Sequence, residues 1–207
     1  MDYHDYIFRD GKFIGAFDDM YNDVGDPWIQ TEQDFENIAT TSRLVFWLKK
    51  EKIRSAHSLG CGTGLHLNWL SKQCERVSFS GSDISSAAIT QAQSNFTHIP
   101  FHQGSLSNFA EEPSDSEAII VREVLWYAEP EWQNFVTLAR KNLVDRYLAL
   151  EVSTYENQRY ATDLYDGAKD LISRFPFTVI EAVRWNPSGS VNAGMVFIWS
   201  RIEDGEK

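Results

Sequence analysis

The sequence contains few cysteines and has no long apolar run. Only two cysteines, Cys61 and Cys74, occur in 207 residues. They are too few for a disulfide framework or a zinc-ligand pattern. No apolar stretch approaches the ~20 residues that a membrane-spanning helix needs. We therefore expect no membrane partner and no structural metal.

Basic residues are also scarce. Nineteen Lys and Arg stand against 30 Asp and Glu, which gives a formal net charge of −11. Because phosphate contacts dominate nucleic-acid affinity, this balance disfavours nucleic acid and anionic membranes as partners. The first residues, MDYHDYIFRDGK, lack the apolar core of a signal peptide. With so little cysteine, we expect a cytoplasmic protein.

The length of 207 residues predicts one domain. Residues 1–30 differ from the rest because they mix glycine, aromatic residues and aspartate in GKFIGAFDDMYNDVGDPW. We interpret them as an N-terminal arm that covers the active site, with surface packing as the alternative. From Thr31 the pattern becomes helical, and Thr31 with Asp34 approximates a capping box. Residues 31–207 are predicted to form the single domain.

Short apolar runs alternate with helix-like stretches along this domain. Strands are expected near 56–59, 77–82, 99–102, 118–121, 147–152, 177–183 and 195–200, and helices near 65–73, 85–95, 130–142 and 160–175. Such alternation indicates βαβ units and a parallel sheet, while the last two strands have no helix between them. The pattern predicts a doubly wound, Rossmann-like α/β/α sandwich whose seven-stranded, mostly parallel sheet has an antiparallel C-terminal strand. Ligands bind such sheets at the carboxyl ends of the strands.

The sharpest motif is HSLGCGTGLHLNWL, residues 57–70, in which Gly60, Gly62 and Gly64 join a strand to a helix. Glycine lets the backbone approach a ligand and present its N–H groups, although a tight turn can also be purely structural. Asp83 follows the next strand, 23 residues after Gly60, where a carboxylate can accept both hydroxyls of a ribose. The alternative is that Asp83 caps the next helix. Together the two features favour a nucleoside-containing cofactor.

At these residues the chain resembles the class I S-adenosylmethionine-dependent methyltransferases. SLGCGTG, GSDIS, HQGSL and AIIVREVLWYAEP are similar to four successive motifs of that family, over roughly residues 30–202. The resemblance implies S-adenosyl-L-methionine as cofactor, with its methionine part at the glycine turn, its ribose at the acid and its adenine beyond. Position by position, these roles fall on Gly60, Cys61, Gly62 and Gly64, on Asp83 and Ile84, and on Gly104, Ser105 and Leu106.

The chain departs from the family pattern at two positions. Ser58 stands where the family usually has an acid that contacts the methionine amino group, and Ser105 stands where it often has an acid near the adenine amine. These departures motivate the alternative of a non-catalytic, cofactor-binding regulator. An NAD(P)-dependent oxidoreductase is a further alternative. It is disfavoured because the glycine spacing is G-x-G-x-G rather than G-x-G-x-x-G and because no Tyr-x-x-x-Lys pair is recognisable.

The segment around Tyr21 and Asp26-Pro27-Trp28, together with REVLWY, is similar to small nodulation-type bacterial methyltransferases and to relatives that modify saccharides. In those enzymes a tyrosine and a DPW-like segment fold over the cofactor, which implies cofactor contacts for Tyr21 and Trp28. Aromatic side chains there would also exclude water and face a sulfonium.

Glu123 and His66 are the candidate catalytic residues. Glu123 follows the fourth strand, where a carboxylate can act as a base or hold an acceptor, and His66 lies early in the glycine-turn helix. Alternatively, His66 belongs to the core and the neighbouring Arg122 pairs with nearby carboxylates. No metal ligands are expected.

The sequence predicts a methyltransferase acting on an O or N of a small polar acceptor, with a saccharide or sugar derivative favoured by the resemblance. An acceptor in nucleic acid is disfavoured because no N-P-P-Y tetrapeptide occurs.

Overall fold

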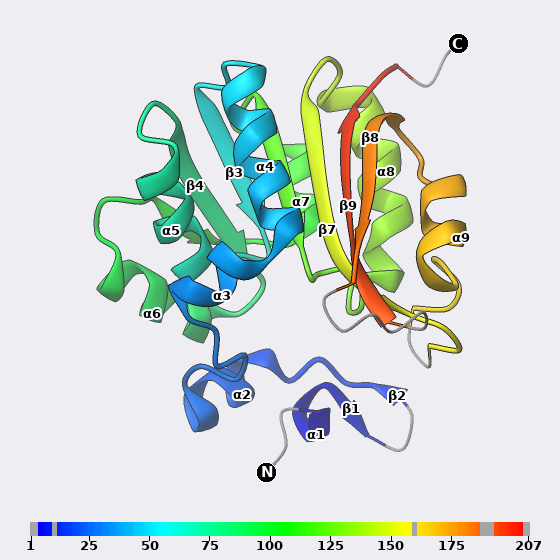
Figure 1. Cartoon of the computed structure of the whole chain (residues 1–207). Helices are drawn as coiled ribbons and strands as arrows, with labels where there is room; N and C mark the ends of the chain where they lie inside the picture. The colour runs from blue at the N-terminus through cyan, green and yellow to red at the C-terminus, as the bar shows by residue number, and fades with distance from the viewer. Residues whose placement is uncertain (1–3, 10–11, 159–160, 187–192, 205–207) are drawn as a thin grey trace.

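A seven-stranded sheet forms the centre of the computed structural model, which describes residues 4–9, 12–158, 161–186 and 193–204 (Figure 1). Its strands, in spatial order, are β5 (Phe101–Gln103), β4 (Ser78–Asp83), β3 (Ser55–Leu59), β6 (Ala118–Arg122), β7 (Tyr147–Tyr155), β9 (Ala193–Arg201) and β8 (Thr178–Trp185). Neighbouring strands from β5 to β7 are parallel, and β9 is antiparallel to both β7 and β8. The predicted sheet is confirmed.

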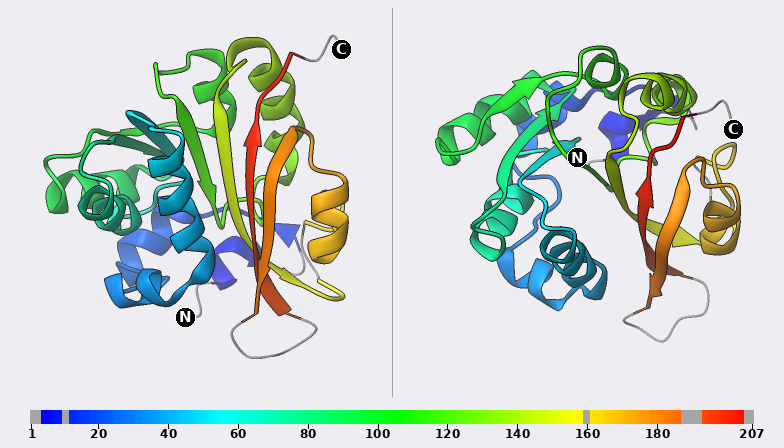
Figure 2. Two further views of the ribbon diagram at one scale, coloured as in Figure 1. Left: turned by 45° about the horizontal axis from the view of Figure 1, so that its top comes forward. Right: turned by 90° about the horizontal axis from the view of Figure 1, so that it is seen from above.

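Helices cover both faces of the sheet (Figure 2). One apolar core lies under α3 (Glu32–Asn37), α4 (Ala39–Lys50), α5 (Leu65–Gln73) and α6 (Ser86–Asn95). The other lies under α7 (Leu106–Glu111), α8 (Glu129–Asn142) and α9 (Gly167–Ser173). The apolar side of each helix is buried against a face of the sheet, and this burial stabilises the three-layer arrangement. In the part of the chain that the structure describes, no helix is long and apolar enough to span a bilayer.

Three expected elements differ in extent from the structure. The helix that begins after Thr31 has the expected capping box with Asp34, but it is interrupted at Ile38, whose φ of −88° and ψ of 114° are extended. The helix expected over residues 160–175 is reduced to α9 because Ala161 and Gly167 have left-handed φ values of 56° and 75°. Residue 160 lies outside the described residues. Strand β7 runs on to Tyr155 because β9 pairs with it along its whole length.

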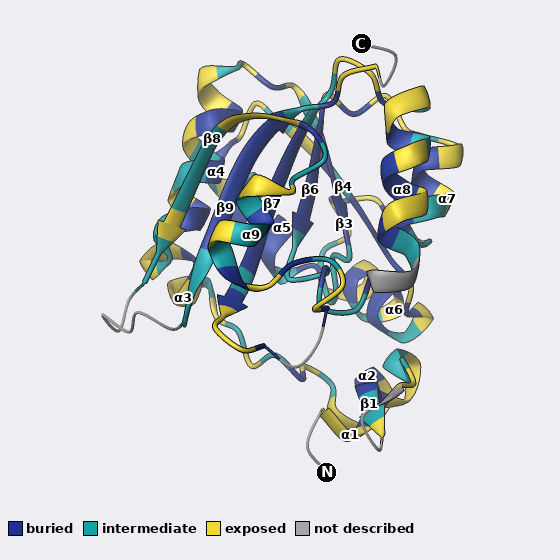
Figure 3. Cartoon of the chain, turned by 90° about the vertical axis from the view of Figure 1, so that its right-hand side faces the viewer, coloured by how far each residue is buried: buried dark blue, intermediate teal, exposed yellow. Residues whose placement is uncertain are grey.

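The N-terminal residues form α1 (His4–Ile7), β1 (Phe8–Arg9), β2 (Lys12–Phe13) and α2 (Phe17–Val24). They lie beyond the carboxyl ends of the parallel strands (Figures 1 and 3). Asp18 attaches this segment to the start of α6, because its carboxylate accepts hydrogen bonds from Ser85 Oγ at 2.7 Å and from the Ala87 amide at 3.1 Å. An acid at a helix N-terminus also interacts favourably with the helix dipole.

His57 is a fully buried titratable residue in the middle of β3. Its Nδ1 lies 2.8 Å from Ser80 Oγ and its Nε2 lies 3.0 Å from Ser82 Oγ, so hydroxyl groups satisfy both nitrogens of a neutral imidazole. Its ring stacks on Phe109 with centroids 4.5 Å apart. Burial, with a smaller effect from His102, lowers the pKa of His57 to about 3.

This pKa predicts that the protein loses stability in mild acid. The unfolded chain takes up a proton at His57 near pH 6.5, whereas the folded chain does so only near pH 3, so stability is lost as pH falls between these values. Linkage gives a loss of about 2 kcal/mol at pH 5 relative to pH 7.5. Urea unfolding at several pH values should show a steeper pH dependence for wild type than for His57→Gln. Parallel profiles would contradict the assignment.

Candidate active site

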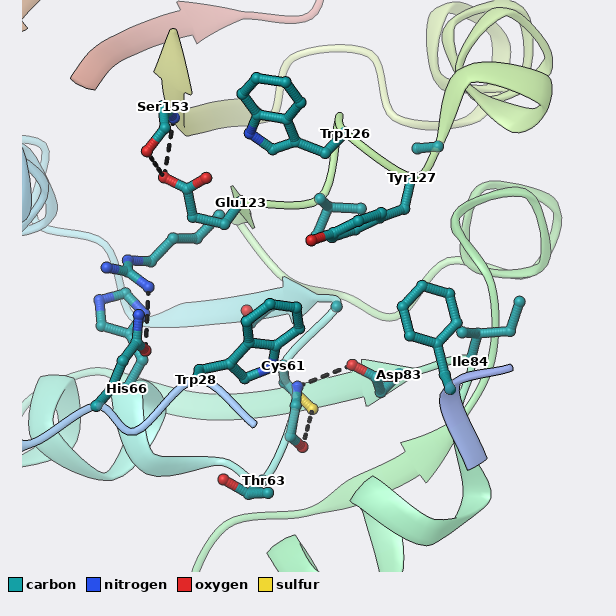
Figure 4. Close-up of a pocket in the computed structure, with 18 of the residues that line it drawn as sticks. Trp28, Cys61, Thr63, His66, Asp83, Ile84, Glu123, Trp126, Tyr127 and Ser153 are labelled. Atoms are coloured by element: carbon teal, nitrogen blue, oxygen red, sulfur yellow. Dashed lines mark hydrogen bonds between the residues drawn. The ribbon is translucent and has the colours of Figure 1, made fainter. Parts of the chain in front are cut away.

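A cavity of about 850 Å³ opens at the carboxyl ends of the parallel strands, between them and the N-terminal segment (Figure 4). Its volume lies in the upper part of the range of about 300–1,000 Å³ that is common for ligand sites. Twelve of the residues predicted from the sequence line it: Tyr21, Trp28, Gly60, Cys61, Gly62, His66, Asp83, Ile84, Gly104, Ser105, Leu106 and Glu123. The fold therefore brings together residues that are far apart in the sequence.

The glycine turn forms one wall of this cavity. Gly60, Gly62 and Gly64 have φ values of 71°, 53° and 83°, which residues other than glycine rarely adopt. A Cβ on Gly60 would come within 2.3 Å of a Val124 methyl group. Gly64 is not a lining residue. It is the N-cap of α5, and a Cβ there would come within 2.7 Å of the Phe101 ring, so its role in the structure is steric.

Asp83 connects the glycine turn to the loop before α6. Its Oδ2 accepts the Gly62 amide at 2.8 Å and its Oδ1 accepts the Ser85 amide at 2.9 Å. The helix cap itself is Ser85, whose side chain accepts the Ala88 amide. Asp83 is only 8% exposed, and this burial raises the pKa of its carboxyl group. Each oxygen keeps a second lone pair that a ligand can use.

Beyond Asp83 the wall becomes apolar and flat. Ile84 is 52% exposed. The Gly104 amide donates to the Asp83 carbonyl at 2.9 Å, and the nearest atom to a Cβ on Gly104 would be 3.9 Å away. Ser105 forms a capping box with Asn108 at the start of α7, so its hydroxyl already has a structural role. Ile84 therefore leaves an uncovered apolar surface beside a carboxylate.

The N-terminal segment supplies an aromatic wall. Trp28 Nε1 donates to the Tyr21 hydroxyl at 2.8 Å, and this hydroxyl lies 3.1 Å from the position of a Cβ on Gly62. Burial, together with Asp83, raises the pKa of Tyr21, so the phenol stays protonated. The Tyr127 ring lies 6.2 Å from Trp28 and 5.5 Å from Phe17 between centroids. Aromatic side chains thus surround this part of the cavity.

Glu123 follows β6 in a left-handed conformation with a φ of 55°. Its Oε1 accepts the Ser153 amide at 2.9 Å and the Ser153 hydroxyl at 2.8 Å, and Trp126 and Tyr127 stand beside it in Figure 4. Burial raises the pKa of Glu123, although Arg122 and Ser153 oppose this shift. Sequence reasoning missed Ser153. A polar residue that follows the apolar strand 147–152 is the signal that indicates it.

His66, the second residue of α5, lines a different part of the cavity, away from Ser153 (Figure 4). Its ring is stacked with Trp69 at 10° and lies 5.0 Å from the Phe35 ring. Burial and the Arg122 charge lower the pKa of His66 well below its ordinary value, which keeps the imidazole neutral and makes it a poor proton acceptor. Tyr127 and Tyr155 also line the cavity.

Arg122 does pair with a carboxylate. Its Nε donates to Glu151 Oε1 at 3.1 Å, and Thr41 Oγ1 donates to the same oxygen at 3.1 Å. The Arg122 and Glu151 side chains are only 8% and 2% exposed. No group of three or more potential metal ligands occurs among the described residues.

Comparison with known proteins agrees with this geometry. Residues 57–146 match the family model described as a methyltransferase domain. No curated protein sequence matches the chain. The matched region is a methyltransferase domain, and it supports the predicted class I S-adenosylmethionine-dependent methyltransferase and its cofactor. It disfavours the oxidoreductase alternative.

Three similar solved structures share the fold. The N-methyltransferase NodS from Bradyrhizobium japonicum WM9 is 20% identical, with a TM-score of 0.62 over 83% of this chain and 98% of that one. NodS in complex with S-adenosyl-L-homocysteine is 18% identical, with a TM-score of 0.58 over 84% and 92%. The methyltransferase domain of bacterial CtHen1-C is 18% identical, with a TM-score of 0.60 over 83% and 98%.

The lining residues fit the cofactor. The buried Asp83 carboxylate suits a diol, the exposed Ile84 side chain suits a flat base, and the turn at Gly60 and Gly62 leaves no room for side chains. These features match the predicted ribose, adenine and methionine positions. The individual contacts remain predictions.

We expect Asp83 to stabilise the fold as well. Asp83→Asn removes a carboxylate oxygen from one of two buried amides, which should lower the free energy of unfolding by about 1–3 kcal/mol. Asp26→Asn is the matched control, because Asp26 accepts only an exposed hydrogen bond from the Trp28 amide, at 3.1 Å. Denaturant unfolding of both variants is the measurement. Equal effects would show that the Asp83 contacts contribute nothing specific.

Proposed function

We propose that the enzyme methylates an oxygen or nitrogen of a small polar acceptor, with a saccharide or sugar derivative as the favoured class. The observation that carries this proposal is Glu123, a half-buried carboxylate with one oxygen bound by Ser153, in the wall of an aromatic-lined cavity. When bound, S-adenosyl-L-methionine would supply an electrophilic methyl group: the acceptor atom bonds to the methyl carbon in line with the carbon–sulfur bond, and S-adenosyl-L-homocysteine leaves. The similar NodS is an N-methyltransferase, which supports a nitrogen atom as one possible acceptor atom.

Glu123 has the properties of a general base. Ser153 fixes Oε1 through two hydrogen bonds, which orients the carboxylate and leaves Oε2 to accept a proton from a hydroxyl or ammonium group of the acceptor. Its raised pKa brings it nearer to neutral pH, where a base transfers protons most effectively. His66 is already neutral and packed among aromatic rings, so we assign it a role in lining the site.

Two further aromatic residues in the cavity suit a sugar-like acceptor. Trp126 and Tyr155 lie 5.7 Å apart between ring centroids, and both line the cavity near Glu123. Aromatic rings offer a large apolar face, while Tyr and Trp keep a polar edge for hydroxyl groups. A cytoplasmic location and the lack of nucleic-acid and membrane partners remain predictions from the sequence.

Glu123→Gln should lower turnover while cofactor affinity stays within a few fold. The amide keeps the size of the side chain but cannot take a proton, and general-base catalysis contributes about 10²–10⁴-fold. Mass spectrometry of a panel of saccharide hydroxyl and amine acceptors, looking for the gain of one CH₂ unit, measures turnover. Wild-type turnover should fall as pH falls through the raised pKa of Glu123, and the variant should lack this dependence.

Glu156→Gln is the control for this experiment, because Glu156 is exposed and is not a lining residue. Normal turnover of Glu123→Gln at saturating cofactor, together with lost cofactor affinity, would place Glu123 on the cofactor side instead. Cofactor binding by wild type without methylation of any acceptor would favour the non-catalytic regulator.

Trp28→Ala should weaken binding of S-adenosyl-L-homocysteine by about tenfold, because the indole is part of the cavity wall and holds the Tyr21 hydroxyl. Phe46→Ala changes a 43% exposed aromatic residue on α4 and is the control. Calorimetry gives the affinities, and thermal unfolding gives the stabilities. Full affinity of the Trp28 variant, or of the chain lacking residues 1–29, would mean that the N-terminal arm is only surface packing.

A further inference from the structure

Arg122 is a buried cation in the wall of the cavity. The bond from its Nε to Glu151 holds the guanidinium on one side, and the Phe35 ring lies under it, 5.2 Å from Cζ to the ring centroid. Thr41 in turn donates to the Glu151 carboxylate. Glu151 and Phe35 therefore hold the guanidinium from two sides, and Thr41 holds Glu151.

The guanidinium still has donors to offer. It carries five N–H groups in a rigid fork. Within the described residues, Nε donates to Glu151, Nη1 makes a long contact of 3.4 Å with Gln30 Oε1, and Nη2 has no acceptor. Because Arg122 lines the cavity, these donors can reach a ligand there, and arginine binds carboxylates more strongly than neutral acceptors. The free edge of Arg122 is therefore suited to a carboxylate ligand.

This edge lies next to the glycine turn. Leu59 pairs with Val121, so Arg122 on β6 is level with the beginning of the turn on β3. Ser58 also lines the cavity, and its side chain is uncharged. His66 lines the same region, and its buried Nε2 has no hydrogen-bond partner among the described residues. Next to the turn, the cavity wall thus carries a cation, Arg122, in addition to the Asp83 carboxylate.

We propose that Arg122 binds the α-carboxylate of the methionyl part of S-adenosyl-L-methionine, with Glu151 as the positioning residue that holds the guanidinium. The inference rests on the cofactor assignment, and it gives this chain a way to hold the amino-acid end of the cofactor without an acid at position 58. The neutral His66 imidazole lies where it can contribute a further hydrogen bond.

The test compares two ligands that differ only in this carboxylate, S-adenosyl-L-methionine and its decarboxylated form. Calorimetry should show that wild type prefers the carboxylated ligand by about tenfold or more. In Arg122→Lys the charge is kept but the planar fork is lost, and the preference should shrink. Arg43→Lys is the matched control, because Arg43 pairs with Glu181 between α4 and β8, and neither residue lines the cavity.

An unchanged ligand preference in Arg122→Lys would overturn the inference, as would an equal loss for both ligands, which indicates a purely structural role. If Arg122→Lys does not fold, the double variant Arg122→Gln/Glu151→Gln replaces it, because it leaves no unpaired buried charge. Failure of wild type to bind either ligand would overturn the cofactor assignment itself. That result differs from equal binding of both ligands, which refutes only the Arg122 contact.

Discussion

Two backbone amides share the Asp83 carboxylate, and the floor of the active site depends on this arrangement. The Gly62 amide belongs to the turn after β3, and the Ser85 amide belongs to the loop after β4. One side chain thus sets the spacing of two loops and also presents a negative charge to the cavity. Binding and stability cannot vary independently at such a position. The Asp83 carboxylate has to be buried to bind the two amides, and it has to stay accessible to bind the ligand.

Glu123 shows a similar conflict. A left-handed φ at a residue other than glycine costs about 1–3 kcal/mol, and burial disfavours the charged carboxylate. The bond from the Glu123 amide to the Glu151 carbonyl and the two bonds from Ser153 offset part of this cost. Strained backbone and a buried ionisable group occur together most often where chemistry takes place. This coincidence, more than the position of Glu123 after a strand, distinguishes it from the other carboxylates.

The positions of the strands along the chain and the mostly parallel sheet were predictable because apolar runs and glycine turns are local signals. The G-x-G-x-G turn and Asp83 were found for the same reason. Contacts made across the fold were not predictable, such as the Ser153 bonds to Glu123 and the identity of Glu151 as the partner of Arg122. The predicted helix boundaries were wrong where residues in the left-handed conformation interrupt the helix. Nothing in the sequence indicates that Ala161 adopts this conformation.

The bond between Asp18 and the start of α6 has a thermodynamic consequence. Tyr21 and Trp28 belong to the same N-terminal segment and line the cavity. A ligand that touches both this segment and the sheet adds to the free energy that holds them together. By linkage, the factor by which docking of the segment tightens the ligand equals the factor by which the ligand tightens docking. A substitution at Asp18, which does not line the cavity, therefore acts on ligand affinity through the population of the docked segment.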